Sequence, residues 1–260
     1  MNLFWAAVFF WLGAIIGSFL NVVIARVPVG QSIAYPPSHC PKCLNAIRWY
    51  DNIPIFSYFM LLGRCRDCSE RISVRYPMVE LITACMSLGL YWKYDLSPSL
   101  GFFFIFIAAM EAVFWIDLDH MIIPDVISLN GTVIGLATIT AGLVPGLTWK
   151  DSFSGLVLGG LILYVPAVIY ERIRGVEGLG GGDIKLLAMI GAFIGPYGVI
   201  FVLFFASFIG SLVAFAGIAF RGTSSSAPVP FGPFLTAAAV LYVFVGQEIT
   251  DRFIELGHLF

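Results

Sequence analysis

Long apolar runs separated by short polar segments dominate the chain. The first run, 3–25, contains one polar amide, Asn21, and no charge. As a helix it is long enough to cross the roughly 30 Å hydrocarbon core of a bilayer. No basic region precedes it and no small-residue cleavage site precedes Arg26. The pattern therefore predicts a retained membrane anchor rather than a removed signal peptide.

Further apolar runs follow along the rest of the chain, and the sequence predicts about eight transmembrane helices in all. The run 184–195 is short and ends at Gly195-Pro196, so it is either a crossing or a re-entrant segment. The expected fold class is an all-α polytopic membrane protein. The runs after the first are 77–91, 99–116, 126–147, 152–170, 184–195, 197–220 and 234–245.

Composition supports a membrane protein and excludes some functions. Apolar residues make up 59% of the chain and charged residues 12%, whereas about a quarter of an ordinary soluble domain is charged. A soluble body of this length could not bury so much apolar surface, so the excess must face lipid. The formal net charge of −2 leaves no basic excess for phosphates, and we expect no nucleic-acid partner.

The distribution of basic residues predicts the orientation, because Lys and Arg accumulate in short cytoplasmic loops. The first polar segment is rich in Lys and Arg, which places it in the cytoplasm, and threading the spans from there puts both termini outside. Arg172, Arg174, Lys185 and Arg221 then share the cytoplasmic side. Only Lys93, Lys150 and Arg252 lie opposite.

That segment carries two CxxC pairs, Cys40/Cys43 and Cys65/Cys68. Four thiolates at this spacing are typical of zinc ribbons, in which they bind one tetrahedral Zn²⁺. Two disulfides or a redox dithiol are the alternatives, but a cytoplasmic location keeps structural thiols reduced. We expect a small cytoplasmic domain of zinc-ribbon type held by structural zinc. The expected organisation is a first helix at 1–26, a zinc domain at 27–76 and a multi-helix membrane domain at 77–260.

Ionisable residues at membrane depth are costly and invite a functional interpretation. Asp117 and Asp119 end the third run, and Asp183 begins the sixth, at the same leaflet by the threading above. Two carboxyl groups at one site ionise unequally and can supply an acid and a base for activating water. On a continuous helix, Asp117 and Asp119 project about 200° apart, so only one of them can face a partner helix. Glu80 and Glu111 lie within other runs.

Structural roles compete with chemistry at these positions. Asp183 and Asp125 each stand where a carboxylate stabilises the first turn of a helix. Gly180, Gly181 and Gly182 are not needed for such a cap, and they allow close backbone approach beside Asp183. Lys185 is either an anion contact or a snorkelling anchor.

Several motifs, in order and spacing, resemble those of the bacterial type IV prepilin peptidases, also called leader peptidase/N-methyltransferases, and the resemblance covers nearly the whole chain. They are Gly17-Ser18-Phe19-Leu20-Asn21-Val22-Val23-Ile24 with Arg26, the paired CxxC motifs, Arg75-Tyr76-Pro77 with Val79-Glu80, Ile116-Asp117, Ile123-Pro124-Asp125, Gly180-Gly181-Gly182-Asp183-Ile184-Lys185-Leu186-Leu187 and Pro230-Phe231-Gly232-Pro233-Phe234.

The resemblance implies an intramembrane aspartic endopeptidase of the GxGD type in the bacterial inner membrane. It would cut type IV prepilins or type II secretion pseudopilins after a leader Gly, then methylate the new N-terminal Phe with S-adenosylmethionine. The catalytic acids it implies are Asp117 and Asp183, with Asp119 and Asp125 as supporting neighbours. It assigns no residue to the methyl donor.

Two other classes of protein remain as alternatives. A proton or ion transporter would use Glu80, Glu111 and Asp117 as a pathway. A membrane scaffold with a zinc ribbon would use the acids only as helix caps. Neither alternative explains the glycines before Asp183 together with the paired acids at 117 and 119.

Overall fold

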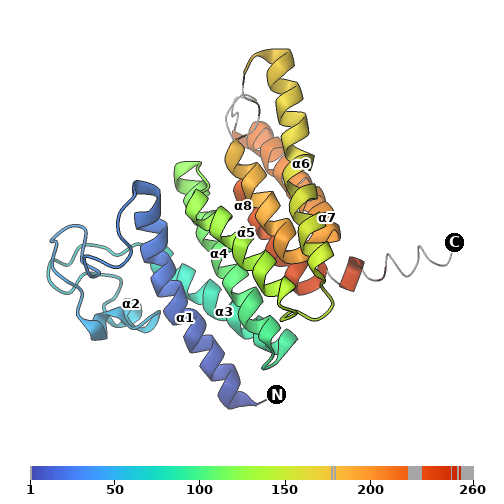
Figure 1. The fold of residues 1–260 in the computed structure, drawn as a ribbon. Helices are drawn as coiled ribbons and strands as arrows, with labels where there is room; N and C mark the ends of the chain where they lie inside the picture. The colour runs from blue at the N-terminus through green and yellow to red at the C-terminus, as the bar shows by residue number, and fades with distance from the viewer. Residues whose placement is uncertain are drawn as a thin grey trace. The chain divides into compact units, whose positions relative to one another are not determined.

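The computed structural model describes residues 2–176, 178, 180–221, 230–246, 248–250 and 252. Over these residues the chain is helical, and extended pairing is limited to two isolated bridges, His39 with Ala46 and Arg64 with Arg71. The chain forms two compact units, Met1–Ala108 and Ala109–Phe260. Figure 1 shows the helices in chain order from blue to red.

The first unit joins two long helices to a polar domain of short elements. Helix α1 spans Leu3–Arg26 and helix α3 spans Arg75–Tyr94, and the first part of α4, Pro98–His120, also belongs here. Between α1 and α3 lie the 3-10 turns η1 (Val27–Val29) and η2 (Trp49–Asn52) and the short helix α2 (Phe56–Met60).

Two glycines one turn apart bring α1 against α3. A Cβ at Gly13 would lie 2.7 Å from Ala84 Cα, and a Cβ at Gly17 would lie 2.7 Å from Glu80 Cα. The Ser87 hydroxyl donates to the Phe9 carbonyl at 2.8 Å across the same contact. Lipid gives little hydrophobic drive to helix association, so such close backbone packing and interhelical hydrogen bonds hold membrane helices together.

The second unit contains the end of α4 and four further helices: α5 (Asp125–Thr140), α6 (Trp149–Arg174), α7 (Gly181–Arg221) and α8 (Gly232–Leu241), which continues into the π-helical turn η3 (Tyr242–Gly246). Helix α5 ends well before position 147, where the apolar run stops. Gly142 has a φ of 71°, which an α-helix does not admit, so the helix terminates in a left-handed turn.

Helix α7 is broken at Gly195, where φ is 75° and ψ is 179°, directly before Pro196. A Cβ at Gly191 would lie 2.9 Å from Val199 Cγ2, although a straight helix would separate these positions by about 12 Å. The chain therefore folds back at Gly195. The apolar runs 184–195 and 197–220 form two separate arms of α7.

Glycine pairs also hold α5 and α6 against the first arm of α7. Gly155 and Gly159 of α6 face the backbone of Gly191 and Leu187, so closely that neither position has room for a Cβ. On α5, Gly131 and Gly135 face the side chains of Met189 and Phe193. The Ser152 hydroxyl adds a hydrogen bond to the Ala192 carbonyl at 2.6 Å. Figure 1 shows these helices as neighbours.

Within the part of the chain that the structure describes, four helical segments are long and apolar enough to cross a membrane: Leu3–Val29, Pro98–His120, Trp149–Arg174 and Gly181–Ala219. Asp125–Thr140 and Gly232–Gly246 are shorter apolar helices. Large apolar side chains such as Phe4, Phe204 and Phe215 lie exposed on the outside of their helices. Such a surface suits lipid rather than water, so this is a helical membrane protein.

Candidate active site

Asp117 occupies the buried side of the last turns of α4. Its side chain is 4% exposed, whereas Asp119 lies on the exposed side. The helix continues through His120 and ends where Met121 takes a φ of 52°. Because the helix does not break between the two acids, they point in different directions, and the structure turns Asp117 into the bundle.

The first residue of α8 holds the Asp117 carboxylate. The backbone N–H of Gly232 donates a hydrogen bond to it. A Cβ on Gly232 would lie 2.5 Å from Asp117 Oδ2 and 3.2 Å from Ile123 Cδ1. The first N–H groups of a helix have no partner within the helix and bind anions readily. A side chain at this position would displace the carboxylate.

Asp183 stands in the first turn of α7 and lies in the same unit as Asp117. It is half-buried, and its backbone N–H bonds to the Gly180 carbonyl at 3.2 Å. Ile123 lies against the position of Gly182, the residue before Asp183, and also against that of Gly232, which binds Asp117. The fold thus brings together two acids from different helices that lie far apart in the sequence.

The three glycines before Asp183 have different surroundings. A Cβ on Gly182 would lie 3.0 Å from Ile123 Cβ, so this position packs closely against the α4–α5 connection. A Cβ on Gly181 would meet no atom within 4 Å, and one on Gly180 would lie 3.7 Å from Asp183 Oδ2. Gly180 and Gly181 therefore leave open space beside the Asp183 carboxyl.

Asp125 and Lys185 form an ion pair beside this site. Lys185 Nζ lies 2.7 Å and 2.8 Å from the two carboxylate oxygens of Asp125. Asp125 stands in the first turn of α5, and its carboxylate is held by Lys185. The pair links the beginning of α5 to the beginning of α7, and both side chains remain partly exposed.

The four cysteines of the first unit form a compact cluster. Their sulfur atoms all lie within 4.8 Å of one another, and the Cys40 and Cys68 sulfurs are 3.8 Å apart. Tetrahedral zinc with Zn–S bonds near 2.3 Å separates its sulfurs by about 3.8 Å. The thiols are free, so the cluster has the donor set and spacing of a metal site.

Both CxxC pairs lie in the same local backbone structure, repeated 25 positions along the chain. Cys40 receives a hydrogen bond from Leu44 N–H at its carbonyl, as Cys65 does from Ser69. Leu44 and Ser69 have φ values of 61° and 58°. The backbone N–H groups of Cys43 and Lys42 donate to the Cys40 sulfur and lower the pKa of this thiol to about 7. Such donors favour the thiolate that metals bind.

The sequence reasoning missed Gly232 and Ile123 as site residues. Gly232 could have been found from its place at the beginning of the last apolar run, where free N–H groups are expected. Ile123 contacts the positions of both Gly182 and Gly232, and nothing in its residue type indicated this.

These features define the class of protein: a helical membrane protein with two interacting carboxyl groups among its helices and a four-cysteine cluster in a polar domain. Comparison with known families makes the assignment specific. Residues 11–94 match the bacterial peptidase A24 N-terminal domain, and residues 104–215 match the type IV leader peptidase family.

Curated relatives extend over nearly the whole chain. A prepilin leader peptidase/N-methyltransferase of Pseudomonas aeruginosa is 33% identical, over 95% of this chain and 92% of its own length. A type 4 prepilin-like proteins leader peptide-processing enzyme of Escherichia coli is 38% identical, over 90% of this chain and 91% of its own. No solved structure matches the chain. The chain belongs to the type IV leader peptidase family.

Proposed function

We propose that this protein is an intramembrane aspartic endopeptidase that removes the leader peptide of type IV prepilins or type II secretion pseudopilins after Gly. The observation that carries the proposal is the meeting of Asp117 and Asp183 in the second unit. The names of the relatives support the substrate class, since they are called prepilin leader peptidases.

In the proposed reaction, one acid of the pair takes a proton from water while the other polarises the scissile carbonyl. Attack by the resulting hydroxide forms a tetrahedral intermediate. Its collapse breaks the C–N bond, and the departing amine takes up a proton. The pair titrates as a unit, so neither acid has a fixed role at rest. The open space at Gly180 and Gly181 suits an extended substrate segment beside Asp183.

The other proposed site residues support the pair. Gly182 would let the chain approach Ile123 closely, and the ion pair of Lys185 with Asp125 would fix the beginning of α7. Asp119 would act only as a neighbouring charge. In this scheme residues 77–260 form the peptidase domain and residues 1–26 the first transmembrane helix.

We also propose that the chain crosses the bacterial inner membrane about eight times, with both arms of α7 and helix α3 counted as crossings. The accumulation of Lys and Arg between α1 and α3 supports a cytoplasmic position for that segment. The threading puts Asp117 and Asp183 at the same side, within reach of a leader peptide held in the cytoplasm.

Residues 27–76 would form a domain organised by one structural Zn²⁺ on Cys40, Cys43, Cys65 and Cys68. The sulfur spacing and the free thiols support this assignment. A small polar domain buries little apolar surface, so metal binding would supply much of its folding free energy.

The second proposed activity is N-methylation of the new N-terminal residue with S-adenosylmethionine, which the names of the relatives favour. One experiment tests both activities. The purified protein is given a synthetic prepilin and S-adenosylmethionine, and mass spectrometry reports leader loss and methyl gain separately. An intact prepilin after prolonged incubation with folded, zinc-loaded protein would overturn the peptidase proposal.

A further inference from the structure

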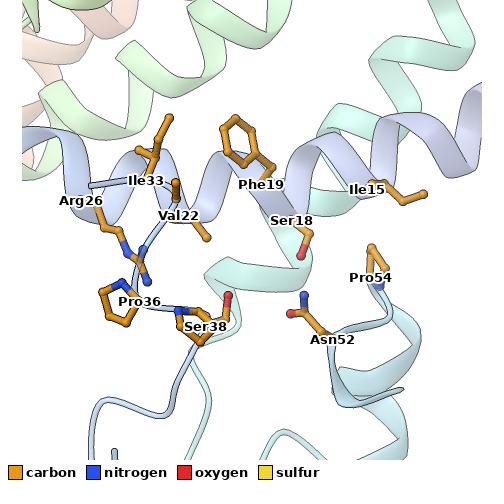
Figure 2. Close-up of a pocket in the computed structure, with 12 residues that line it drawn as sticks. Ile15, Ser18, Phe19, Val22, Arg26, Ile33, Pro36, Ser38, Asn52 and Pro54 are labelled. Atoms are coloured by element: carbon orange, nitrogen blue, oxygen red, sulfur yellow. The ribbon is translucent and has the colours of Figure 1, made fainter. Parts of the chain in front are cut away.

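A cavity of about 570 Å³ lies within the first unit, between the polar domain and the adjoining ends of α1 and α3. Its volume is in the range of small-molecule sites. A second cavity of about 320 Å³ lies beside α1, and Ser18, Val22, Arg26, Ser38 and Asn52 line both. Figure 2 shows Ser18 and Arg26 projecting from α1 toward the loops that carry Asn52 and Ser38.

Glu80 is the buried acid of the larger cavity. Its side chain comes from α3 and is 8% exposed. Oε2 accepts a hydrogen bond from the backbone N–H of Ile55 at 2.7 Å, and the Ser18 hydroxyl also donates to the carboxylate. Three separate parts of the chain therefore fix this one carboxylate in place.

The donor at Ile55 is held at a conformational cost. Ile55 has a φ of 63°, which is unfavourable for a β-branched residue. Strained backbone of this kind persists where the surrounding structure imposes it, and it is concentrated at ligand sites. Here the strain directs a backbone N–H at the Glu80 carboxylate.

Two of the acids that line the cavity are paired with arginines, and a third, Glu70, lies 4.0 Å from Lys42. Asp51 pairs with Arg66 at 2.6 Å, and Asp67 lies 3.9 Å from Arg48. Glu80 has two hydrogen-bond donors but no Lys or Arg partner among the described residues. Arg26 donates a hydrogen bond to the Ser32 carbonyl at 3.0 Å. Like Glu80, it has no oppositely charged side chain as a partner in the described ranges. The cavity thus offers a ligand the buried Glu80 carboxylate and the guanidinium groups of Arg26 and Arg71.

We infer that this cavity binds the methyl donor, S-adenosylmethionine, with Glu80 as the counter-charge for its cationic sulfonium and ammonium groups and Arg26 as the partner of its carboxylate. The inference deepens the proposed methyl transfer and rests on it. The hydroxyl and amide groups that line the cavity, among them Tyr58 and Asn52, supply hydrogen-bond partners for a ribose and an adenine.

Methyl transfer needs no reactant besides the methyl donor and the substrate amine. The neutral N-terminal amine of the cut substrate attacks the methyl carbon, and the C–S bond breaks with its electron pair left on sulfur. The products are S-adenosylhomocysteine and a methylated ammonium, which releases one proton to water. Glu80 binds the donor in this scheme, and the peptidase acids take no part.

The test measures equilibrium binding of tritiated S-adenosylmethionine to the full chain in lipid nanodiscs, with S-adenosylhomocysteine as competitor. Glu80→Gln keeps the hydrogen-bond acceptor for Ile55 N–H but removes the charge. We expect it to bind the donor at least about tenfold more weakly, because hydrogen bonds and contacts to a charged partner are the strong ones. Glu171→Gln removes an exposed acid of α6, outside the cavity, and should bind within about twofold of the parent.

Two measurements show that Glu80→Gln is folded: its zinc content and its cleavage of prepilin should equal those of the parent. If the variant loses zinc, ultraviolet crosslinking of the labelled donor to the unmodified chain decides instead. The label is expected in peptides from residues 18–80. Label confined to residues 109–260, or equal donor affinity in parent and folded Glu80→Gln, overturns the assignment.

Failure of this site is distinguishable from failure of the proposed function. A parent chain that methylates a precut peptide while Glu80→Gln binds the donor normally refutes the site and leaves methyl transfer intact. A parent chain that cleaves prepilin but neither binds the donor nor methylates refutes the methyltransferase proposal, and this site with it.

Discussion

The cysteine cluster and the paired acids are assembled in different ways. All four cysteines lie in one polar segment, and each CxxC pair forms its own turn with the same hydrogen bonds. Asp117 and Asp183 come from α4 and α7, and their meeting depends on the packing of the helices around them. The metal site is therefore a local structure that a short segment specifies. The acid site is a tertiary structure, sensitive to changes far from either acid.

Asp117→Asn and Asp183→Asn should have the largest effect. An amide cannot take or give the proton, so we expect cleavage to fall by roughly 10²–10⁴-fold in each variant. Leader loss measured by mass spectrometry checks this. Asp119→Asn is the matched control, because its side chain lies on the exposed side of the same helix, and its effect should be much smaller.

The same variants also test whether cleavage and methylation take place at separate sites in the two units. A precut pilin with Phe at its N-terminus, offered to the Asp117→Asn, Asp183→Asn protein, should still be methylated if the donor binds in the first unit. If label transfer disappears although the protein is folded, the two activities share one site.

Cysteine substitutions should impair methylation and leave cleavage less affected, the reverse of the aspartate substitutions. Cys43→Ser combined with Cys68→Ser removes one sulfur from each pair, and we expect the chain to lose its zinc and the order of residues 27–76, while the membrane helices persist. Methylation should fall more than cleavage. Metal analysis and proteolysis of the polar segment are the measurements. Stoichiometric zinc in this double variant would place the ligands elsewhere.

Gly232→Ala tests how far the acid site depends on its neighbours. The added Cβ would lie 2.5 Å from Asp117 Oδ2, so the carboxylate must move. A shift of about 1 Å in a reacting group can cost on the order of 10²-fold in rate. We expect a loss of that size in cleavage with zinc unchanged. Gly101→Ala adds the same atom to the helix of Asp117, at a position where nothing lies within 4 Å, and it should cleave within a few-fold of the parent.

The contrast also explains what the sequence could predict. The apolar runs indicated the helices, and the CxxC spacing indicated a cluster that the structure contains. For Asp117 and Asp119 the residues gave only the alternative that one of them faces inward, because the choice depends on which side of α4 the other helices cover. The place of Gly232 at the beginning of an apolar run indicates free N–H groups, but its contact with Asp117 joins two helices, so the partner depends on their packing.

The helix contacts themselves were also missed, although their signal was present. Gly13/Gly17, Gly131/Gly135 and Gly155/Gly159 are each four residues apart, the spacing that lets membrane helices approach closely. The end of α5 at Thr140 was not predictable from hydropathy, because the apolar run continues through the turn at Gly142.

Gly159→Ala should lower the thermal stability more than the neighbouring substitution Gly160→Ala does. A Cβ at Gly159 has no room against the Leu187 carbonyl, whereas one at Gly160 would lie 3.7 Å from Ala188 Cβ, an ordinary contact. Overpacking of this kind costs about 1–3 kcal/mol. Gly160→Ala should be neutral or slightly stabilising, since alanine favours helix. Thermal unfolding in detergent measures both, and equal midpoints for the two variants would contradict the packing argument.

The smallest effect should come from the ion pair beside the cysteine cluster. Two hydrogen bonds from Arg66, at 2.8 Å and 2.6 Å, hold the pKa of the Asp51 carboxyl below its ordinary value. Since the folded pKa is the lower one, the pair stabilises the domain above about pH 4 and ceases to do so as the pH falls through the folded value.

Arg66→Ala should therefore release zinc to a chelator about two- to fivefold faster at pH 7. That difference should persist down to about pH 4 and narrow below it. Lys42→Ala, which removes an exposed and longer contact to Glu70 at 4.0 Å, should match the parent throughout. A difference between Arg66→Ala and the parent that stays constant with pH would mean that Arg66 acts by packing on Tyr50, 5.5 Å from its guanidinium, rather than through the Asp51 charge.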